Sequence, residues 1–252
     1  PEEVRPLIVA FNDMMARLEE NLQAQRRFIA DAAHQMRTPI TGLKMQAELA
    51  LRERDPQALR QDLQRLHGAA ERAAHLIQQL LTLARAESSS ETVHRIERLD
   101  VQELLRDVAL ELYPKAQHKA LELGFDESEG RLEVEGNRLM LQELFKNLVD
   151  NAIKYTPPGG SVTLRALARG DSVDVEIEDT GIGIPPADRP RVFERFYRVL
   201  DTGVDGSGLG LAIVREIAEM HRADVSLEPN PHGQGTLARV RFPLPARSPA
   251  RQ

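Results

Sequence analysis

The sequence predicts a chain of mixed class, in which an antiparallel helical hairpin is followed by an α/β sandwich. Residues 1–88 contain only two of the 16 glycines and show helical periodicity. Residues 95–245 alternate strand-like and helix-like patterns and contain most of the other glycines. A single hairpin buries only one stripe of each helix. We therefore expect two hairpins to pair as a dimeric antiparallel four-helix bundle, so that the protein is a homodimer.

The composition excludes several classes of function. A net charge of −6 argues against nucleic-acid binding, which needs a basic surface. The absence of cysteine excludes disulfides and thiolate metal sites and fits a reducing compartment. No apolar run approaches the roughly 18–20 residues of a membrane span. The chain begins with Pro1 rather than methionine, so we expect a fragment whose N-terminal part is missing.

The second helical segment carries the clearest periodicity in the chain. Its apolar residues follow an unbroken heptad spacing at Leu59, Leu63, Leu66, Ala70, Ala73, Ile77, Leu80 and Ala84. Asp55 and Pro56 provide a helix cap and a first-turn proline, so the hairpin turn should lie near residues 52–56. The first segment has similar seams, which are interrupted between Met14 and Leu22 and again beside Pro39.

The second half of the chain predicts a sheet covered by helices. Strand-like alternation at residues 162–166 and 173–177 flanks Arg169-Gly170-Asp171, which is typical of a hairpin turn. Helical patterns occupy residues 101–118, 137–155 and 209–221.

His34 is the first candidate for chemistry. It lies two residues from Ala32 and from Met36, which belong to the apolar seam. At about 100° per residue both neighbours lie far round the helix, so His34 should project outward. Thr38, one turn later, shares its face. A neutral imidazole has one lone pair available for nucleophilic attack. An alternative interpretation remains open at this point: His34 is an exposed side chain without a catalytic role, on a helix that serves only as a coiled-coil spacer.

A polar cluster on the helix 137–155 is the second candidate. Asn147, Asn151 and Lys154 are spaced four and three residues apart, so they share one face. Amide oxygens are hard ligands suited to Mg²⁺, and a lysine provides a point charge for phosphate. A plain polar helix face explains this cluster equally well.

Three glycine-containing segments follow. Asp179 ends a strand and precedes Gly181 and Gly183, a place where a ligand can approach the backbone. Gly206-Ser207-Gly208-Leu209-Gly210 opens a helix, whose bare amides attract phosphate. This is not a dinucleotide-binding fingerprint, because a loop precedes it instead of a strand. Gly233 to Thr236 heads the last strand and by itself is typical of a hairpin turn.

A region of about 20 residues rich in proline and glycine separates the segment after Asp179 from the segment that begins at Gly206. Loops of that length within a compact domain are usually functional lids. Arg195 and Arg198 lie in this region and could reach a terminal phosphate, where charge neutralisation matters most. The neighbouring aromatic residues would anchor the closed lid.

The order of these clusters resembles the sensor histidine kinases of two-component systems. Residues 28–39 resemble their phosphoacceptor segment, and the later clusters resemble the N, G1, F, G2 and G3 boxes of the ATP-binding domain shared with gyrase, Hsp90 and MutL. The resemblance implies that His34 accepts the phosphoryl group and that Thr38 positions water for phosphatase activity. Gln35 departs from the usual acidic proton acceptor. An amide cannot act as a general base, so another group must take the proton.

The resemblance also implies roles in the ATP site. Asn151 is implied as the main Mg²⁺ ligand, with Asn147 assisting, and Tyr155 as part of the adenine pocket. Asp179 would recognise adenine, and the remaining nucleotide contacts fall to Lys154 and to the glycine boxes with their flanking residues Gly181, Gly183, Gly206, Gly208, Leu209, Gly210 and Thr236.

The implied organisation is a HAMP-like signalling helix end at 1–22 and a dimerisation and phosphotransfer hairpin at 23–87. A linker at 88–94 leads to a catalytic ATP-binding domain at 95–246, which ends in a flexible tail at 247–252. We expect the cytoplasmic portion of a bacterial inner-membrane protein that is anchored through a missing N-terminal region and passes its phosphoryl group to the receiver domain of a response regulator.

Two alternatives remain open. An ATPase of the gyrase, Hsp90 or MutL type would need a water-activating glutamate one turn before Asn151, where this chain has Asn147. A dimeric scaffold that binds ATP without transferring phosphate is favoured only by Gln35.

Overall fold

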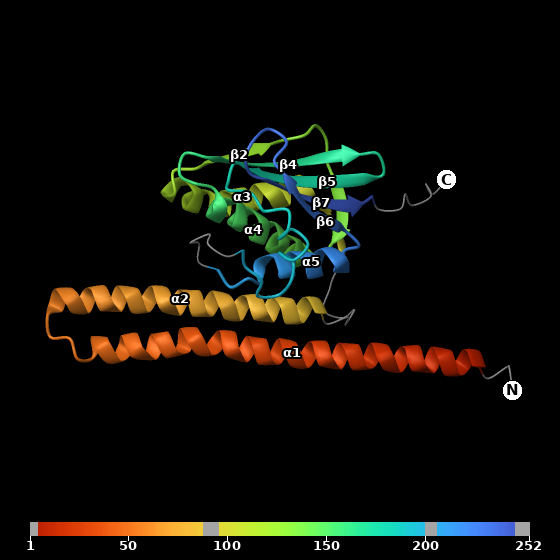
Figure 1. Cartoon of the computed structure of the whole chain (residues 1–252). Coiled ribbons are helices and arrows are strands. Elements are labelled where there is room, and N and C mark those ends of the chain that lie inside the picture. Colours follow the sequence, from red (N-terminus) through yellow and green to blue (C-terminus); the bar gives the residue numbers. More distant parts are fainter. Residues whose placement is uncertain (1–4, 88–95, 200–205, 245–252) are drawn as a thin grey trace. The chain divides into compact units, whose positions relative to one another are not determined.

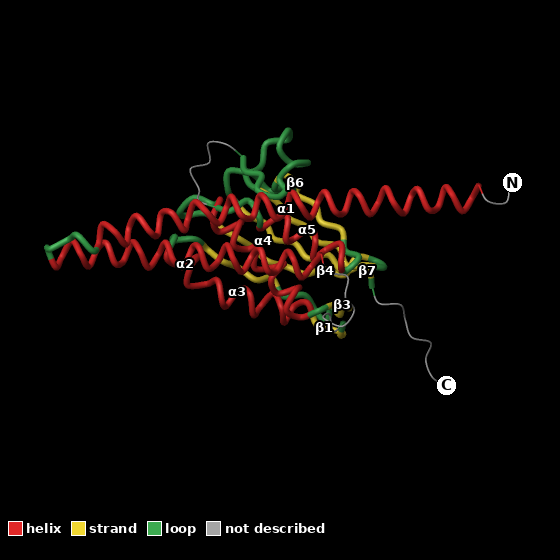
Figure 2. Tube along the Cα trace, turned by 90° about the horizontal axis from the view of Figure 1, so that it is seen from below, coloured by secondary structure: helices red, strands yellow, loops and turns green. Residues whose placement is uncertain are grey.

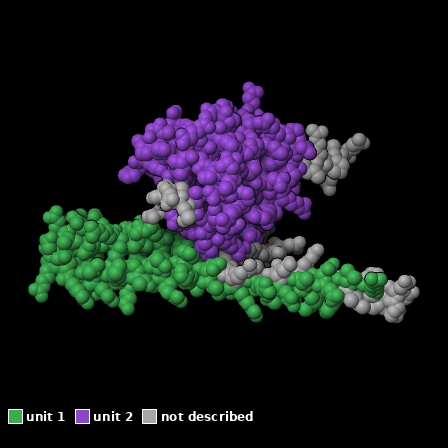
Figure 3. Space-filling view, viewed as in Figure 1, with its two compact units in different colours: residues 1–80 green, residues 81–252 purple. Residues whose placement is uncertain are grey.

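The computed structural model describes residues 5–87, 96–199 and 206–244 (Figure 1). The chain divides into two compact units, Pro1–Leu80 and Leu81–Gln252 (Figure 3). Each unit is described by itself below. Among the described residues, no helix has both the length and the apolar character that crossing a membrane requires.

The first unit is the predicted helical hairpin. Helix α1 spans Arg5–Ala50 and helix α2 spans Pro56–Glu87, and the two run antiparallel side by side (Figures 1 and 2). Asp55 caps α2, because its carboxylate accepts hydrogen bonds from the backbone N–H groups of Gln57 at 3.3 Å and Ala58 at 3.1 Å. The predicted cap and turn are therefore confirmed.

Helix α1 continues through Pro39 without a break. Several apolar side chains of α1 are largely exposed in the single chain, among them Phe11, Met14, Leu18 and Ile29. A stripe of this kind is unusual on a surface that faces water alone.

The second unit contains a five-stranded sheet and a small two-stranded sheet. The order across the larger sheet is β2-β4-β5-β7-β6, in which β2 is parallel to β4 and the other neighbours are antiparallel. Strands β1 and β3 pair antiparallel. The strand bounds are Glu97–Asp100 (β1), Glu122–Asp126 (β2), Glu133–Gly136 (β3), Ser161–Arg169 (β4), Ser172–Asp179 (β5), Asp224–Pro229 (β6) and Thr236–Pro243 (β7).

Three helices cover one face of the larger sheet (Figure 1). They are α3 (Val101–His118), α4 (Arg138–Tyr155) and α5 (Gly210–Met220), so each predicted helix is confirmed to within one residue at either end. The core lies between the helices and the sheet. There Phe145 of α4 meets Phe242 of β7 edge to face, with ring centroids 6.2 Å apart.

The other face of the sheet carries a network of ion pairs. Arg165 of β4 contacts Glu176 at 2.8 Å and Glu178 at 2.7 Å, and Arg239 of β7 contacts Glu176 at 3.0 Å. Glu176 is only 3% exposed. Burial would raise the pKa of Glu176, but the hydrogen bonds from Arg165 and Arg239 hold it below its usual value.

We predict that Glu176→Gln lowers the free energy of unfolding by about 1–3 kcal/mol at pH 7, because two part-buried arginines lose their shared partner. A lowered pKa means that Glu176 stabilises the fold above its unfolded pKa of about 4.3, and that this contribution is lost as the pH falls through the folded value. Denaturant unfolding followed by circular dichroism between pH 7 and pH 3 measures both effects, and the variant should show the shallower pH dependence.

Glu135→Gln is the matched control, because Glu135 forms a largely exposed pair with Arg98 at 3.8 Å. Equal losses in the two variants would contradict a special role for the network.

Candidate active site

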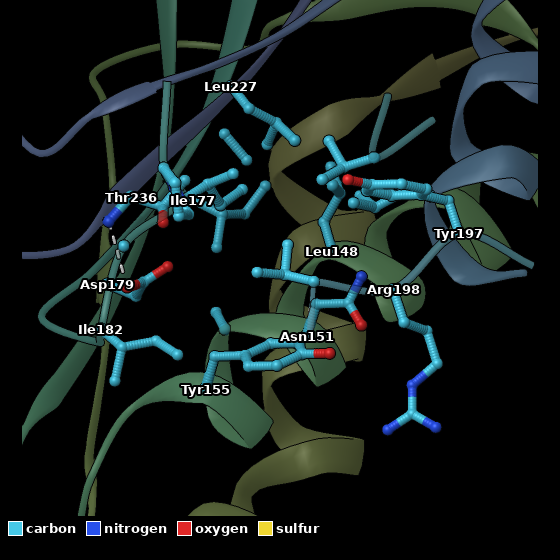
Figure 4. Close-up of a pocket in the computed structure, with 18 residues that line it drawn as sticks. Leu148, Asn151, Tyr155, Ile177, Asp179, Ile182, Tyr197, Arg198, Leu227 and Thr236 are labelled. Carbon is cyan, nitrogen blue, oxygen red and sulfur yellow. Dashed lines mark hydrogen bonds between the residues drawn. The ribbon is translucent and has the colours of Figure 1, made fainter. Parts of the chain in front are cut away.

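A cavity of about 340 Å³ opens within the second unit. Its walls come from α4, from the end of β5 and the loop that follows, and from β6, β7 and the start of α5 (Figure 4). The remaining wall is the described part of the long loop, residues 184–199, which we call the lid. Among the residues that the sequence predicted for a nucleotide site, this cavity is lined by Asn151, Tyr155, Asp179, Gly183, Arg198 and Thr236 but not by Gly206, Gly208, Leu209 or Gly210.

Asp179 lies at the inner end of this cavity and is only 7% exposed. Its Oδ1 accepts hydrogen bonds from the backbone N–H groups of Gly181 at 2.8 Å and Thr236 at 3.1 Å. The other carboxylate oxygen points toward the cavity (Figure 4). Burial raises the pKa of Asp179, although the two backbone hydrogen bonds oppose the shift. The outer oxygen is therefore a poorly solvated acceptor, ready for a donor on a ligand.

Asn230 makes a further contact with Asp179, the last residue of β5. Its Nδ2 donates to the backbone carbonyl of Asp179 at 2.8 Å, and Asn230 is itself buried. The sequence analysis did not identify Asn230. Its only sequence signal is an Asn-Pro pair, which is typical of a turn and does not point to a residue 51 positions earlier.

The glycines beside Asp179 are needed for close packing. A Cβ added to Gly181 would lie 2.6 Å from the backbone oxygen of Tyr155. A Cβ on Gly235 would collide with the backbone oxygen of Asp179. Gly183 has φ of +74° and lines the cavity. The backbone around Asp179 therefore packs too closely for a side chain at Gly181 or Gly235.

The two asparagines of α4 meet the start of α5. A Cβ on Gly210 would lie 3.0 Å from Asn147 Oδ1 and 3.5 Å from Asn151 Nδ2. Asn151 lines the cavity (Figure 4). Asn147 is buried, and its Nδ2 donates to the carbonyl and the carboxylate of Glu143 at 2.8 and 3.1 Å, which turns Oδ1 toward Gly210.

The rest of the glycine segment packs tightly against its surroundings. Leu209 is fully buried, and its N–H donates to Ser207 Oγ at 3.2 Å. Gly208 has φ of +72° and touches the lid backbone, whereas a Cβ on Gly206 would meet no atom of the described residues within 4 Å. Leu209 thus anchors the segment in the core while its glycines stay close to the surface.

The structure places Lys154 differently from the expectation. Its ammonium pairs with Asp150 at 2.6 Å, and Lys115 pairs with the same carboxylate. Lys154 is not among the residues that line the cavity, whereas Tyr155 is (Figure 4). The carboxylate of Asp150, on the same helix, holds the ammonium of Lys154. Sharing a helix face with Asn151 is therefore not enough to bring Lys154 to the cavity.

The two lid arginines, Arg195 and Arg198, differ in whether they line the cavity. Arg198 lines the cavity (Figure 4), whereas Arg195 donates to Glu216 of α5 at 3.1 Å and does not line it. Tyr197 forms part of the wall, and its hydroxyl donates to Asp188 at 2.5 Å. The guanidinium of Arg191 lies over the Tyr197 ring, 4.3 Å from its centre.

The hairpin presents His34 as predicted. His34 and Thr38 are both exposed on α1, and Gln35 between them is half-buried. The outward direction of the imidazole is therefore confirmed for the single chain, and a hydroxyl one turn away shares its face.

Comparison with known proteins agrees with both units. Residues 24–89 match the model of the His Kinase A (phospho-acceptor) domain. Residues 136–246 match the model of the histidine kinase-, DNA gyrase B- and HSP90-like ATPase. The sensor protein QseC of Escherichia coli (strain K12) is 37% identical over 226 residues, which are 89% of this chain and 49% of that protein. The chain spans about half the length of the curated relatives it matches.

Solved structures support the same family. The mycobacterial sensor histidine kinase MprB is 30% identical, with a TM-score of 0.51 over 59% of this chain and 97% of that one. The histidine kinase ThkA in complex with the response regulator protein TrrA is 23% identical, with a TM-score of 0.72 over 93% of this chain and 65% of that one, and it shows the fold. From its two matched domains and these relatives, the chain belongs to the sensor histidine kinases.

Proposed function

We propose that this chain is the cytoplasmic core of a sensor histidine kinase, which transfers the γ-phosphoryl group of ATP to His34 and from there to an aspartate of a response regulator. The observation that carries the proposal is that Asp179, Asn151 and, at the start of α5, Leu211 line one cavity in a chain that also presents His34 on an exposed helix face. The first part binds a nucleotide and the second supplies a nucleophile.

The pocket favours an adenine nucleotide in one orientation. The outer oxygen of Asp179 would accept from the adenine amino group, and Tyr155 and Ile182 provide apolar surface for the ring. The phosphates would then extend toward Asn151 and the segment 206–210, where backbone amides at the start of α5 favour negative charge.

The residues present fit a magnesium ion at the phosphate end. Asn147 Oδ1 faces Gly210, and the Asn151 amide lies against the same glycine. Amide oxygens are ligands that Mg²⁺ accepts. We propose that Asn151 and Asn147 hold Mg²⁺, which when bound neutralises charge on the phosphates.

The transfer step would use His34 as the nucleophile. The lone pair of one ring nitrogen forms the P–N bond while the bond between the γ-phosphorus and the bridging oxygen breaks, and its electrons leave with ADP. The proton on the other ring nitrogen passes to water or phosphate, because the Gln35 amide cannot accept it. Arg198, beside the cavity, is the lid cation placed to balance charge on the terminal phosphate.

The partners follow from the exposed surfaces of the hairpin and from the relatives. A second copy would cover the apolar stripe on α1 and complete a four-helix bundle. ThkA is solved with a response regulator, and we propose that a receiver domain likewise docks on this hairpin.

We also propose membrane anchoring through a preceding segment at the bacterial inner membrane. The domain limits proposed are 1–22, 23–87, 88–94, 95–246 and 247–252; residues 88–94 and 247–252 lie outside the described residues.

A non-transferring ATP-binding scaffold is the second candidate, and Gln35 is the feature that favours it. The gyrase-type ATPase is less supported, because Asn147 occupies the position of the water-activating glutamate.

Asp179→Asn should weaken binding of Mg²⁺–ATP by roughly 10–100-fold, since the ligand loses a hydrogen bond to a charged acceptor. Isothermal titration calorimetry measures the affinity. Glu178→Gln is the control, because Glu178 is the adjacent carboxylate and pairs with Arg165 outside the cavity. An unchanged affinity for Asp179→Asn would rule out its role in recognising adenine.

Incubation with γ-labelled ATP should label the wild-type chain on nitrogen, so the label is lost in acid and kept in base. His34→Ala should abolish labelling because the nucleophile is gone. His75→Ala, which removes an exposed histidine of α2, should label normally. Acid-stable label, or label that persists in His34→Ala, would contradict the assignment.

Thr38→Ala should spare autophosphorylation and slow dephosphorylation of the phosphorylated regulator by roughly 10–100-fold, because the hydroxyl beside His34 positions water. Both rates are measured with the same purified chain and regulator. If both fell together, a folding defect would explain the result instead.

A further inference from the structure

Arg195 lies in the lid but is not among the residues that line the cavity. Its Nη2 is 3.1 Å from Glu216 Oε1, and both side chains are 28% exposed. Three residues later, Arg198 does line the cavity. Two arginines of the same loop therefore have different surroundings, and their roles need not be the same.

Glu216 belongs to a rigid element. It lies in α5, between Ile213 and Ile217, which are both fully buried against the core. The same helix begins at Gly210, the last residue of the segment 206–210 that we propose for the phosphates. An ion pair with Glu216 thus joins the lid to the helix that the phosphate segment opens.

The residue after Arg195 makes a second link to the same region. The N–H of Phe196 donates to the carbonyl of Gly208 at 2.8 Å. Phe196 has φ of +62°, which is uncommon for a residue other than glycine. A Cβ on Gly208 would lie 2.6 Å from the carbonyl carbon of Phe196, so the two backbones are in direct contact.

We infer that Arg195 is a positioning residue that fastens the base of the lid to α5 through Glu216, and that it is not a ligand of the terminal phosphate. The inference rests on the proposed function insofar as the cavity takes a nucleotide. Together with the Phe196–Gly208 contact, the ion pair holds in place lid residues that line the cavity, among them Val192, Tyr197 and Arg198.

The two roles predict different kinetics. A residue that only holds the cavity wall affects nucleotide binding, so its loss raises KM and leaves kcat nearly unchanged. A residue that neutralises charge on the transferred phosphoryl group lowers kcat. A positioning pair can also be restored by exchanging its members, whereas a phosphate ligand cannot be restored by a change on α5.

The experiment compares Arg195→Glu, Glu216→Arg and the double exchange in the full chain. Three quantities are measured: the Kd for Mg²⁺–ATP, the KM and kcat of autophosphorylation, and amide hydrogen exchange of lid residues 184–199 without nucleotide. Each single reversal should weaken nucleotide binding roughly tenfold and accelerate lid exchange, because like charges then face each other. The double exchange should return the Kd to within about threefold of wild type and restore slow exchange.

The exchange of Arg215 and Glu219 is the matched control. This pair lies on the same helix, with N and O atoms 2.9 Å apart, but both side chains are more than half exposed and neither lies in the lid. The control exchange should leave all three quantities at their wild-type values.

The outcomes separate this inference from the proposed function. Should Glu216→Arg behave like wild type while the double exchange stays as weak as Arg195→Glu, Arg195 acts on the ligand and the inference is overturned. Unchanged lid exchange in both single reversals also overturns it. If wild type binds ATP but never phosphorylates His34, the proposed function fails, while rescue of the Kd and of lid exchange still supports the anchoring pair.

Discussion

The Asp179 carboxyl group is the point at which separate segments of the nucleotide domain are joined. One oxygen takes two backbone hydrogen bonds, from Gly181 in the next loop and from Thr236 at the start of β7, and the Asp179 carbonyl takes a third from Asn230. Burying a carboxylate is costly, and these contacts offset part of that cost. The outer oxygen is therefore held in one direction, toward the cavity, before any ligand arrives (Figure 4).

The opposite end of the site depends on backbone rather than on charge. Gly210 lies against both asparagines of α4, and Gly208 lies against Phe196 of the lid. In neither place is there room for a Cβ without displacement of its neighbours. The segment 206–210 therefore meets the lid through backbone atoms and α4 through the side-chain amides of its two asparagines, which explains how a site assembled from distant segments keeps a defined shape.

Local features of this fold were predictable because they are encoded in neighbouring residues. The limits of α3, α4 and α5 follow from their apolar periodicity, and the start of α2 follows from the Asp55 cap. The outward direction of His34 follows from its spacing to the seam. Each of these depends on residues within about two helical turns.

The remaining features depend on which distant groups meet, and no local pattern contains that information. Lys154 lies on the predicted helix face but forms an ion pair with Asp150, and Arg195 lies in the predicted loop but forms an ion pair with Glu216. Neither residue lines the cavity. The parallel pairing of β2 with β4 and the contact of Asn230 with Asp179 likewise join segments remote in sequence. Spacing therefore predicted which segments lie beside the cavity more reliably than which side chains line it.

The central claim is that position 34 meets the terminal phosphate of a nucleotide held by the Asp179 pocket. The chain contains no cysteine, so a His34→Cys variant carries a single thiol. Treated with an ATP analogue that bears a thiol-reactive group on its γ-phosphate, this variant should be crosslinked, and either excess ATP or the added Asp179→Asn change should suppress the reaction. Equal crosslinking of a His75→Cys variant, or crosslinking that ATP does not suppress, would contradict the account.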